Sequence, residues 1–156
     1  MNARFNYVTI APGAYEAMLG LERYLKSSSL EEPLIHLLKL RASQINGCAY
    51  CIDMHWKDLR GGAETEQRLY SLDAWRECPF YSPRERAALA WIEGVTLITS
   101  GHVPDALYDE VRQQFSEREL VDLTVVAATI NAWNRLAISA RTEPGRYQPA
   151  ATSTRA

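Results

Sequence analysis

The chain has 156 residues, enough for one domain with its own hydrophobic core, and its 47% hydrophobic and 23% charged residues are typical of a soluble globular protein. A net charge of −2 without a strongly basic segment gives no reason to expect nucleic acid or a membrane surface as a partner. The longest apolar runs are too short to cross a bilayer, and the N-terminus lacks the features of a secretory signal. We therefore expect a cytoplasmic protein, in which three cysteines do not form a permanent disulfide scaffold.

The first half of the sequence predicts four helices. Pro12 is suited to a first helical turn, and apolar residues follow it at helical spacing. Asn46 and Gly47 form a strong signal for a helix end, so a new helix starts at about Cys48. The expected helices cover residues 12–28, 29–47, 48–60 and 63–75.

The second half predicts three more helices. Ser82 and Glu85 have the spacing of a capping box, as do Ser116 and Glu119. The helices that we expect here cover residues 83–98, 105–115 and 117–139. No alternating strand pattern with a hairpin turn occurs, so the fold class is all-α. We expect one compact helical domain over residues 1–140 and a C-terminal tail or arm over residues 141–156, where the periodicity ends.

The stretch "CAYCIDMH" concentrates the reactive side chains of the chain. On a helix, Cys48, Cys51 and His55 are spaced by three and four residues and share one face. They should lie at the edge of the core, partly shielded and still reachable. The adjoining apolar stripe consists of Ile52, Trp56 and Leu59. The polar positions that we expect to face water are Asp53, Lys57 and Arg60.

This spacing favours redox chemistry. Cys48 falls in the first turn, where free backbone amides and the helix dipole lower the pKa of a thiol. His55 lies one turn beyond Cys51 and can take its proton. The four-residue spacing therefore favours Cys51 as the activated thiolate with Cys48 as the resolving thiol, whereas the helix start favours the opposite assignment.

Two other interpretations compete with the redox pair. Two cysteines and one histidine give three zinc ligands, but no second CxxC or nearby HxxxH completes a closed site, so we expect no metal. The three residues could also be small packing residues, which is less consistent with their clustering in a cysteine-poor chain. Cys78 matches no second motif and fits a packing or loop thiol. No glycine-rich phosphate loop occurs, so no nucleotide or flavin cofactor is expected.

The stretch "LRASQINGCAYCIDMH" resembles the signature of the AhpD-like (alkylhydroperoxidase D) branch of the carboxymuconolactone decarboxylase family. The segments "ETEQRLYSLDAW", "SPRERAALAWIEGVTLI" and "NAWNRLAI" resemble it too, so the likeness covers about residues 15–140. It implies a helical fold with the CxxC in a core helix, a homo-oligomer (trimer or hexamer), and alkylhydroperoxidase or disulfide-reductase activity. It also implies that Cys48 and Cys51 cycle between dithiol and disulfide, with His55 in a proton relay that activates Cys51.

Two positions depart from the pattern of that branch. The relay usually includes a glutamate twelve residues before the first cysteine, where this chain has His36, and the residue before the second cysteine is Tyr50 instead of a histidine. Both side chains can still take part in a relay, but neither supplies the fixed negative charge that a carboxylate would give a protonated His55. This puts peroxidase turnover in doubt and leaves the dithiol chemistry intact. His36 is equally well explained as a hydrogen-bonded residue at the edge of the core.

The expected partners are a hydroperoxide or disulfide substrate and a dithiol or protein electron donor. A second hypothesis is a carboxymuconolactone decarboxylase-like enzyme, but that branch works without CxxC. A third is a non-catalytic redox-sensing oligomer, in which the disulfide of Cys48 and Cys51 changes assembly. Turnover with a hydroperoxide and a dithiol distinguishes the enzyme from the sensor.

Overall fold

The computed structural model of the chain describes residues 2–149, and within them every regular element is a helix. This confirms the all-α prediction. No helix in that part combines the length and apolar character needed to cross a membrane. The elements are α1 (Tyr7–Ile10), α2 (Pro12–Lys26), α3 (Glu32–Asn46), α4 (Ala49–Gly61), α5 (Glu66–Tyr70), η1 (Leu72–Glu77), α6 (Pro83–Thr96), η2 (Ile98–Ser100), α7 (Asp105–Arg112) and α8 (Glu117–Ala140).

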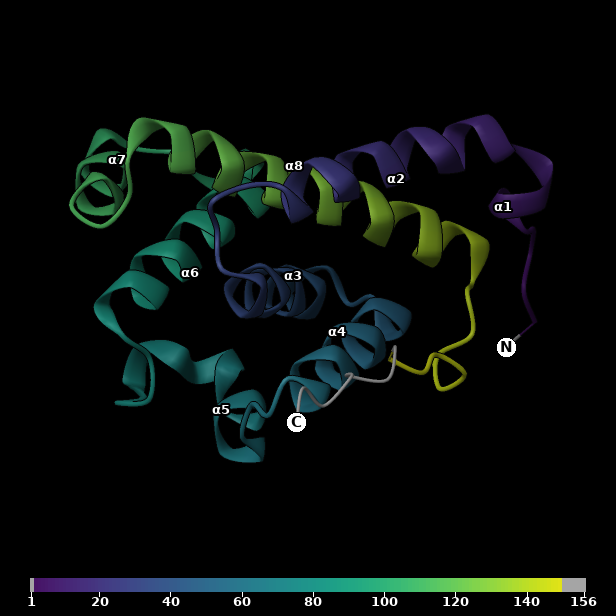
Figure 1. The fold of residues 1–156 in the computed structure, drawn as a ribbon, viewed down its shortest axis with the longest axis horizontal. Coiled ribbons are helices and arrows are strands. Elements are labelled where there is room, and N and C mark those ends of the chain that lie inside the picture. The colour runs from purple at the N-terminus through teal and green to yellow at the C-terminus, as the bar shows by residue number, and fades with distance from the viewer. Residues whose placement is uncertain (1, 150–156) are drawn as a thin grey trace.

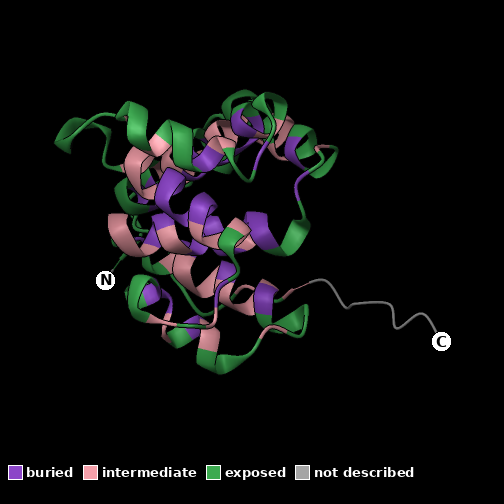
Figure 2. Cartoon of the chain, turned by 90° about the vertical axis from the view of Figure 1, so that its left-hand side faces the viewer, coloured by how far each residue is buried: buried purple, intermediate pink, exposed green. Residues whose placement is uncertain are grey.

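Helix α3 forms the centre of the fold. It packs against α4, α6 and α8, while α2 runs alongside α8 (Figure 1). Leu37, Leu38, Leu40 and Ala42 of α3 are almost fully buried, which explains why this helix is apolar on most of its circumference. Buried segments gather at the centre of the molecule and exposed turns lie outside (Figure 2).

Most of the helix ends match the predicted signals. Gly47 ends α3 in the left-handed conformation, with φ of 68°. Ser82 and Ser116 cap α6 and α8, and the glutamate three residues later completes a capping box in both cases. The predicted fourth helix is divided into α5 and η1. The expected start of the third helix shifts by one residue, because Cys48 has extended backbone angles and is the N-cap of α4.

The segment after α8 returns to the outer face of α4. Lys57 Nζ donates to the carbonyl oxygens of Gly145 and Tyr147, both at 3.1 Å, and the Gly145 amide donates to Asp53 Oδ2 at 3.0 Å. Asp53 and Lys57 are therefore only about a quarter exposed, less than we expected, because both hold this segment, whereas Arg60 is exposed as expected. The assignment of residues 141–156 to a tail stays a prediction, and residues 150–156 lie outside the described part.

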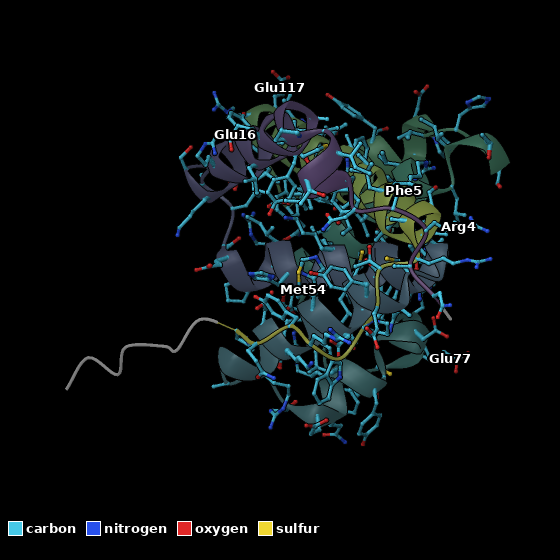
Figure 3. The ribbon with its side chains drawn as sticks, turned by 90° about the vertical axis from the view of Figure 1, so that its right-hand side faces the viewer. Arg4, Phe5, Glu16, Met54, Glu77 and Glu117 are labelled. Atoms are coloured by element: carbon cyan, nitrogen blue, oxygen red, sulfur yellow. The ribbon has the colours of Figure 1, made fainter. Side chains whose placement is uncertain are left out.

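The N-terminal segment lies beside the C-terminal end of α8. The Arg4 amide donates to the Ala140 carbonyl at 2.9 Å, and Arg4 and Phe5 lie close to this end of α8 in Figure 3. This contact brings the short helix α1 over the side of the molecule where α2, α4 and α8 meet. The N-terminus thus contributes to the wall of the cavity described below.

Candidate active site at the start of helix α4

The structure places Cys48, Cys51 and His55 along one side of α4, as the spacing predicts. All three are buried, with 1%, 3% and 3% of their surface exposed. They are thus more deeply enclosed than the partly shielded position that we expected. Cys48 and Cys51 are free thiols. Both ends of the CxxC lie at one helix start, and a disulfide between them stays a prediction.

The two thiols share one proton in a way that favours charge on Cys48. The Cys51 thiol donates to the Cys48 sulfur, and with the backbone amides of Cys51 and Tyr50 it lowers the pKa of Cys48 to about 7 despite burial. The same hydrogen bond, together with burial, raises the pKa of Cys51. The hydrogen bond from Cys51, more than the helix start, therefore favours Cys48 as the thiol that ionises first.

A buried asparagine on α8, which we did not identify from the sequence, supports the thiol pair. Asn134 hydrogen-bonds to both cysteines and so stabilises their ionised form. Its amide nitrogen donates to Ser43 Oγ at 3.0 Å, and its oxygen accepts from Asn46 at 2.8 Å. A polar residue on an apolar face of a helix needs such partners. In the sequence, an asparagine at an apolar position of a helix, as at the end of "NAWN", is the feature that could have identified Asn134.

The two histidines meet across α3 and α4. His36 Nδ1 lies 3.2 Å from His55 Nδ1, so the structure brings the relay position and the motif histidine together. Asp58 Oδ2 lies 3.6 Å from His36 Nδ1 and 3.8 Å from His55 Nδ1. Burial is the main cause that lowers the pKa of His36 and holds that of His55 well below its usual value. Both rings are therefore neutral at pH 7.

Asp58 supplies a carboxylate beside the two histidines, which we did not expect after finding His36 at the relay position. It is three residues after His55 on the same helix, so the helical spacing could have revealed it. The Tyr147 hydroxyl donates to its other oxygen, Oδ1, at 2.6 Å and fixes its orientation. Within residues 2–149, no hydrogen bond joins His55 to either sulfur.

Cys51 faces a cavity of about 220 Å³ that also contacts His55 and Tyr50. Burial raises the pKa of Tyr50, which stays a neutral phenol. Met54, which also lines the cavity, lies on α4 near the centre of the view in Figure 3. The remaining lining comes from α1, α2 and α8: Tyr7, Val8, Tyr15, Glu22, Ile130, Trp133 and Ala137.

The wall of the cavity opposite α4 is aromatic with a single carboxylate. Tyr15 and Trp133 meet edge to face, with ring centres 5.8 Å apart. Glu22 accepts a hydrogen bond from Trp133 Nε1 at 2.8 Å and forms an ion pair with the buried Lys39. The negative charge of Glu22 is thus balanced inside the wall. Neither Glu22 nor Lys39 stood out in the sequence, because their pairing depends on how α2 and α3 pack.

Comparison with known proteins agrees with this architecture. The profile of the carboxymuconolactone decarboxylase family matches residues 12–94. The chain belongs to the carboxymuconolactone decarboxylase family. The uncharacterized protein YdfG of Bacillus subtilis (strain 168) is 50% identical over 139 residues, which make up 89% of this chain and 95% of YdfG.

Two solved structures show the same fold. ATU0492 of Agrobacterium tumefaciens, a protein of unknown function suggested to be the antioxidant defence protein AhpD, is 43% identical. It superposes with a TM-score of 0.90 over 94% of this chain and 100% of its own. The AhpD core of a peroxidase-related protein from Ralstonia eutropha JMP134 superposes with a TM-score of 0.79 at 20% identity, over 89% of this chain and 74% of its own. This family member is thus AhpD-like in fold and has its CxxC at Cys48 and Cys51.

Cys78 lies apart from the thiol pair. It follows η1, is partly buried, and its sulfur lies 3.8 Å from the Ser71 carbonyl oxygen. It does not line the cavity beside Cys51. This placement makes Cys78 a suitable control position for experiments on the pair.

We predict that Cys51→Ala raises the pKa of Cys48 from about 7 toward the 8.5 or so of an unperturbed thiol. The reason is that the variant removes the hydrogen-bond donor that contributes most to the low value. The pKa is measured by following the ultraviolet absorbance of the thiolate while the pH of the reduced protein is raised. Cys78→Ala should leave the transition near pH 7 in place. An unchanged transition in Cys51→Ala would contradict the shared proton.

Proposed function

We propose that the protein is a thiol-dependent oxidoreductase of the alkylhydroperoxidase type, in which Cys48 and Cys51 cycle between dithiol and disulfide. The observation that carries this proposal is the pair of free thiols with one shared proton, where Cys51 opens onto the aromatic-lined cavity. A thiolate paired with a second thiol is the arrangement that peroxide reduction by cysteine needs. The AhpD-like fold of the family supports the same reaction class.

The steps of the proposed reaction balance without a further oxidant. The shared proton passes to Cys48, and the Cys51 thiolate attacks the terminal oxygen of the hydroperoxide. The O–O bond breaks, Cys51 becomes a sulfenic acid, and the alkoxide takes the proton from Cys48 and leaves as an alcohol. The Cys48 thiolate then attacks the Cys51 sulfur. The disulfide forms, and hydroxide leaves as water with a proton from solvent. An external dithiol or protein donor reduces the disulfide again by thiol–disulfide exchange.

This scheme combines the two cysteine assignments that the sequence left open. Cys48 has the lower pKa and holds the resting charge, but Cys51 is the sulfur that lines the cavity. Attack by Cys51 after a short proton transfer is therefore consistent with both facts. The lining by Tyr15, Trp133 and Ile130 favours a small organic hydroperoxide over a highly charged substrate.

We further propose that His55 and His36 carry the proton that is needed when hydroxide leaves. Their Nδ1 atoms are 3.2 Å apart, and His36 reaches solvent with 26% of its side chain exposed, so a proton can pass inward along this pair. Tyr50 is close enough to the cavity to orient the substrate through its hydroxyl. Asp58 stabilises whichever ring is transiently protonated, since its carboxylate lies within 4 Å of both.

The intact thiol pair distinguishes this proposal from one alternative, and turnover distinguishes it from the other. A carboxymuconolactone decarboxylase-like reaction is compatible with the family match, but it makes no use of a CxxC. A redox-sensing oligomer would form the same disulfide but would not consume a hydroperoxide repeatedly. Turnover is therefore the decisive measurement.

We predict that the reduced protein consumes cumene hydroperoxide in the presence of a dithiol, with disulfide formation between Cys48 and Cys51. Cys51→Ser should reduce the rate to the background of the dithiol alone, because no sulfur that faces the cavity remains. Cys48→Ser should allow a single turnover that stops at the sulfenic acid. Cys78→Ser is the matched control and should keep the full rate. Equal rates for the wild type and Cys51→Ser would refute the proposal.

A second pair of variants tests the proton path. His55→Ala should slow hydroperoxide consumption at a fixed neutral pH, and His36→Ala should slow it less, because solvent can partly replace the outer ring. His102→Asn is the control, because this third histidine is exposed and lies in the loop before α7. Stopped-flow measurement of disulfide formation separates this step from reduction by the donor. If His55→Ala forms the disulfide at the rate of the wild type, the histidines are not part of the path.

We also propose that the protein is a homo-oligomer, either a trimer or a hexamer. Large apolar side chains remain exposed on one chain, among them Ile10, Val121 and Ile138 with 71%, 56% and 46% of their surface accessible. Sedimentation velocity at micromolar concentration should give the mass of three or six chains. A single species with the mass of one chain would contradict the assembly while leaving the thiol chemistry untouched.

A further inference from the structure

Three metal-ligand side chains converge at the contact of α3 and α4. The donor atoms are His36 Nδ1, His55 Nδ1 and Asp58 Oδ2, separated by 3.2, 3.6 and 3.8 Å. A tetrahedral zinc ion with bonds of about 2.0–2.1 Å has its ligand atoms about 3.4 Å apart. The three measured separations bracket this value. Only small side-chain rotations would place all three donors on one ion.

The carboxylate is aimed at the two rings without being bonded to either. At 3.6 and 3.8 Å, Asp58 Oδ2 is beyond hydrogen-bond distance from both nitrogens, and it accepts no hydrogen bond from residues 2–149. The two Nδ1 atoms face each other, and one proton at most fits between them. Oδ2 therefore has no hydrogen-bond donor among residues 2–149 and is open to water or an ion, with 13% of the Asp58 side chain exposed. A cation between the three atoms would satisfy all of them.

The surroundings support a cation at this point. Tyr147 donates to Asp58 Oδ1, the type of outer hydrogen bond that orients a metal-binding carboxylate. The positive charge of Lys39 acts on both rings and opposes a cation here, but its ion pair with Glu22 offsets part of it. Glu32 adds a further negative charge close to His36. With 26% of its side chain exposed, His36 also provides a route for an ion and room for water.

We propose that His36, His55 and Asp58 bind a divalent first-row transition metal ion such as Zn²⁺, with a fourth position open to water. Two imidazoles and one carboxylate with an open position are a set that binds zinc and ferrous iron in other proteins. This proposal goes beyond the thiol chemistry and differs from our expectation of no metal. An ion at this point takes the Nδ1 lone pairs of both rings. Metal binding and the proposed proton path therefore exclude each other, and the ion acts as an inhibitor of turnover.

The test measures zinc binding directly by isothermal titration calorimetry on the full chain without an affinity tag, after removal of metals with a chelator. Thiols also bind zinc, so the reference protein is the variant Cys48→Ser/Cys51→Ser/Cys78→Ser, which we expect to bind one ion per chain. In this background, His36→Ala and Asp58→Asn should weaken binding at least roughly tenfold, and Tyr147→Phe should weaken it by a smaller factor. His102→Asn should bind like the reference.

Cobalt provides a second, independent measurement. Co²⁺ in the cysteine-free protein should give the intense visible absorption of a four-coordinate ion, and Asp58→Asn should lose it. Asp58→Asn has the same shape as the native residue, so it remains informative if His36→Ala does not fold, which circular dichroism without metal reveals. Loss of binding in the cysteine-free protein, or full affinity in Asp58→Asn, would overturn the site. Because binding is read without turnover, an inactive but zinc-binding protein would refute only the proposed function.

Discussion

The left-handed turn at Gly47 is the constraint on which the site depends. It lets the Cys48 amide donate to the Ser43 carbonyl at 3.0 Å, which ends α3 and fixes the N-cap of α4 one residue later. A residue with a Cβ would adopt this conformation at a cost of about 1 kcal/mol or more. The turn also folds α4 back along α3. His36 and His55 face each other for this reason, although nineteen residues separate them.

The helix start and the core together explain the properties of the thiol pair. Burial alone would raise the pKa of both cysteines and make them inert. At the N-cap, the Cys51 thiol instead lowers the pKa of Cys48 most, and the backbone amides of Cys51 and Tyr50 lower it further. Asn134 adds a donor from α8 and is itself held by Ser43 and Asn46. Donors from both α4 and α8 thus lower the pKa of Cys48 inside the core.

The features that were predictable from the sequence are those whose physics is local. The left-handed residue Gly47, the two capping boxes and the shared face of Cys48, Cys51 and His55 follow from interactions within four residues. Asn134 and Glu22 were missed because their partners are on other helices, and packing alone brings them together. Asp53 and Lys57 are less exposed than we expected for the same reason. They bind a segment that lies about ninety residues further along the chain.

The position of the carboxylate is the clearest difference from the relay that the sequence resemblance implies. With a glutamate at position 36, a second carboxylate would stand near Asp58. Two unit charges about 4 Å apart near a protein surface repel by about 4 kcal/mol. The neutral ring of His36 avoids this repulsion, and Asp58 supplies the negative charge from α4 instead. Exchanging a carboxylate for an imidazole therefore leaves two rings facing each other and replaces one oxygen donor with a nitrogen. The same exchange gives this family member two nitrogens and one oxygen around a single point, which is the ligand set of the proposed metal site as well as the proposed route for a proton.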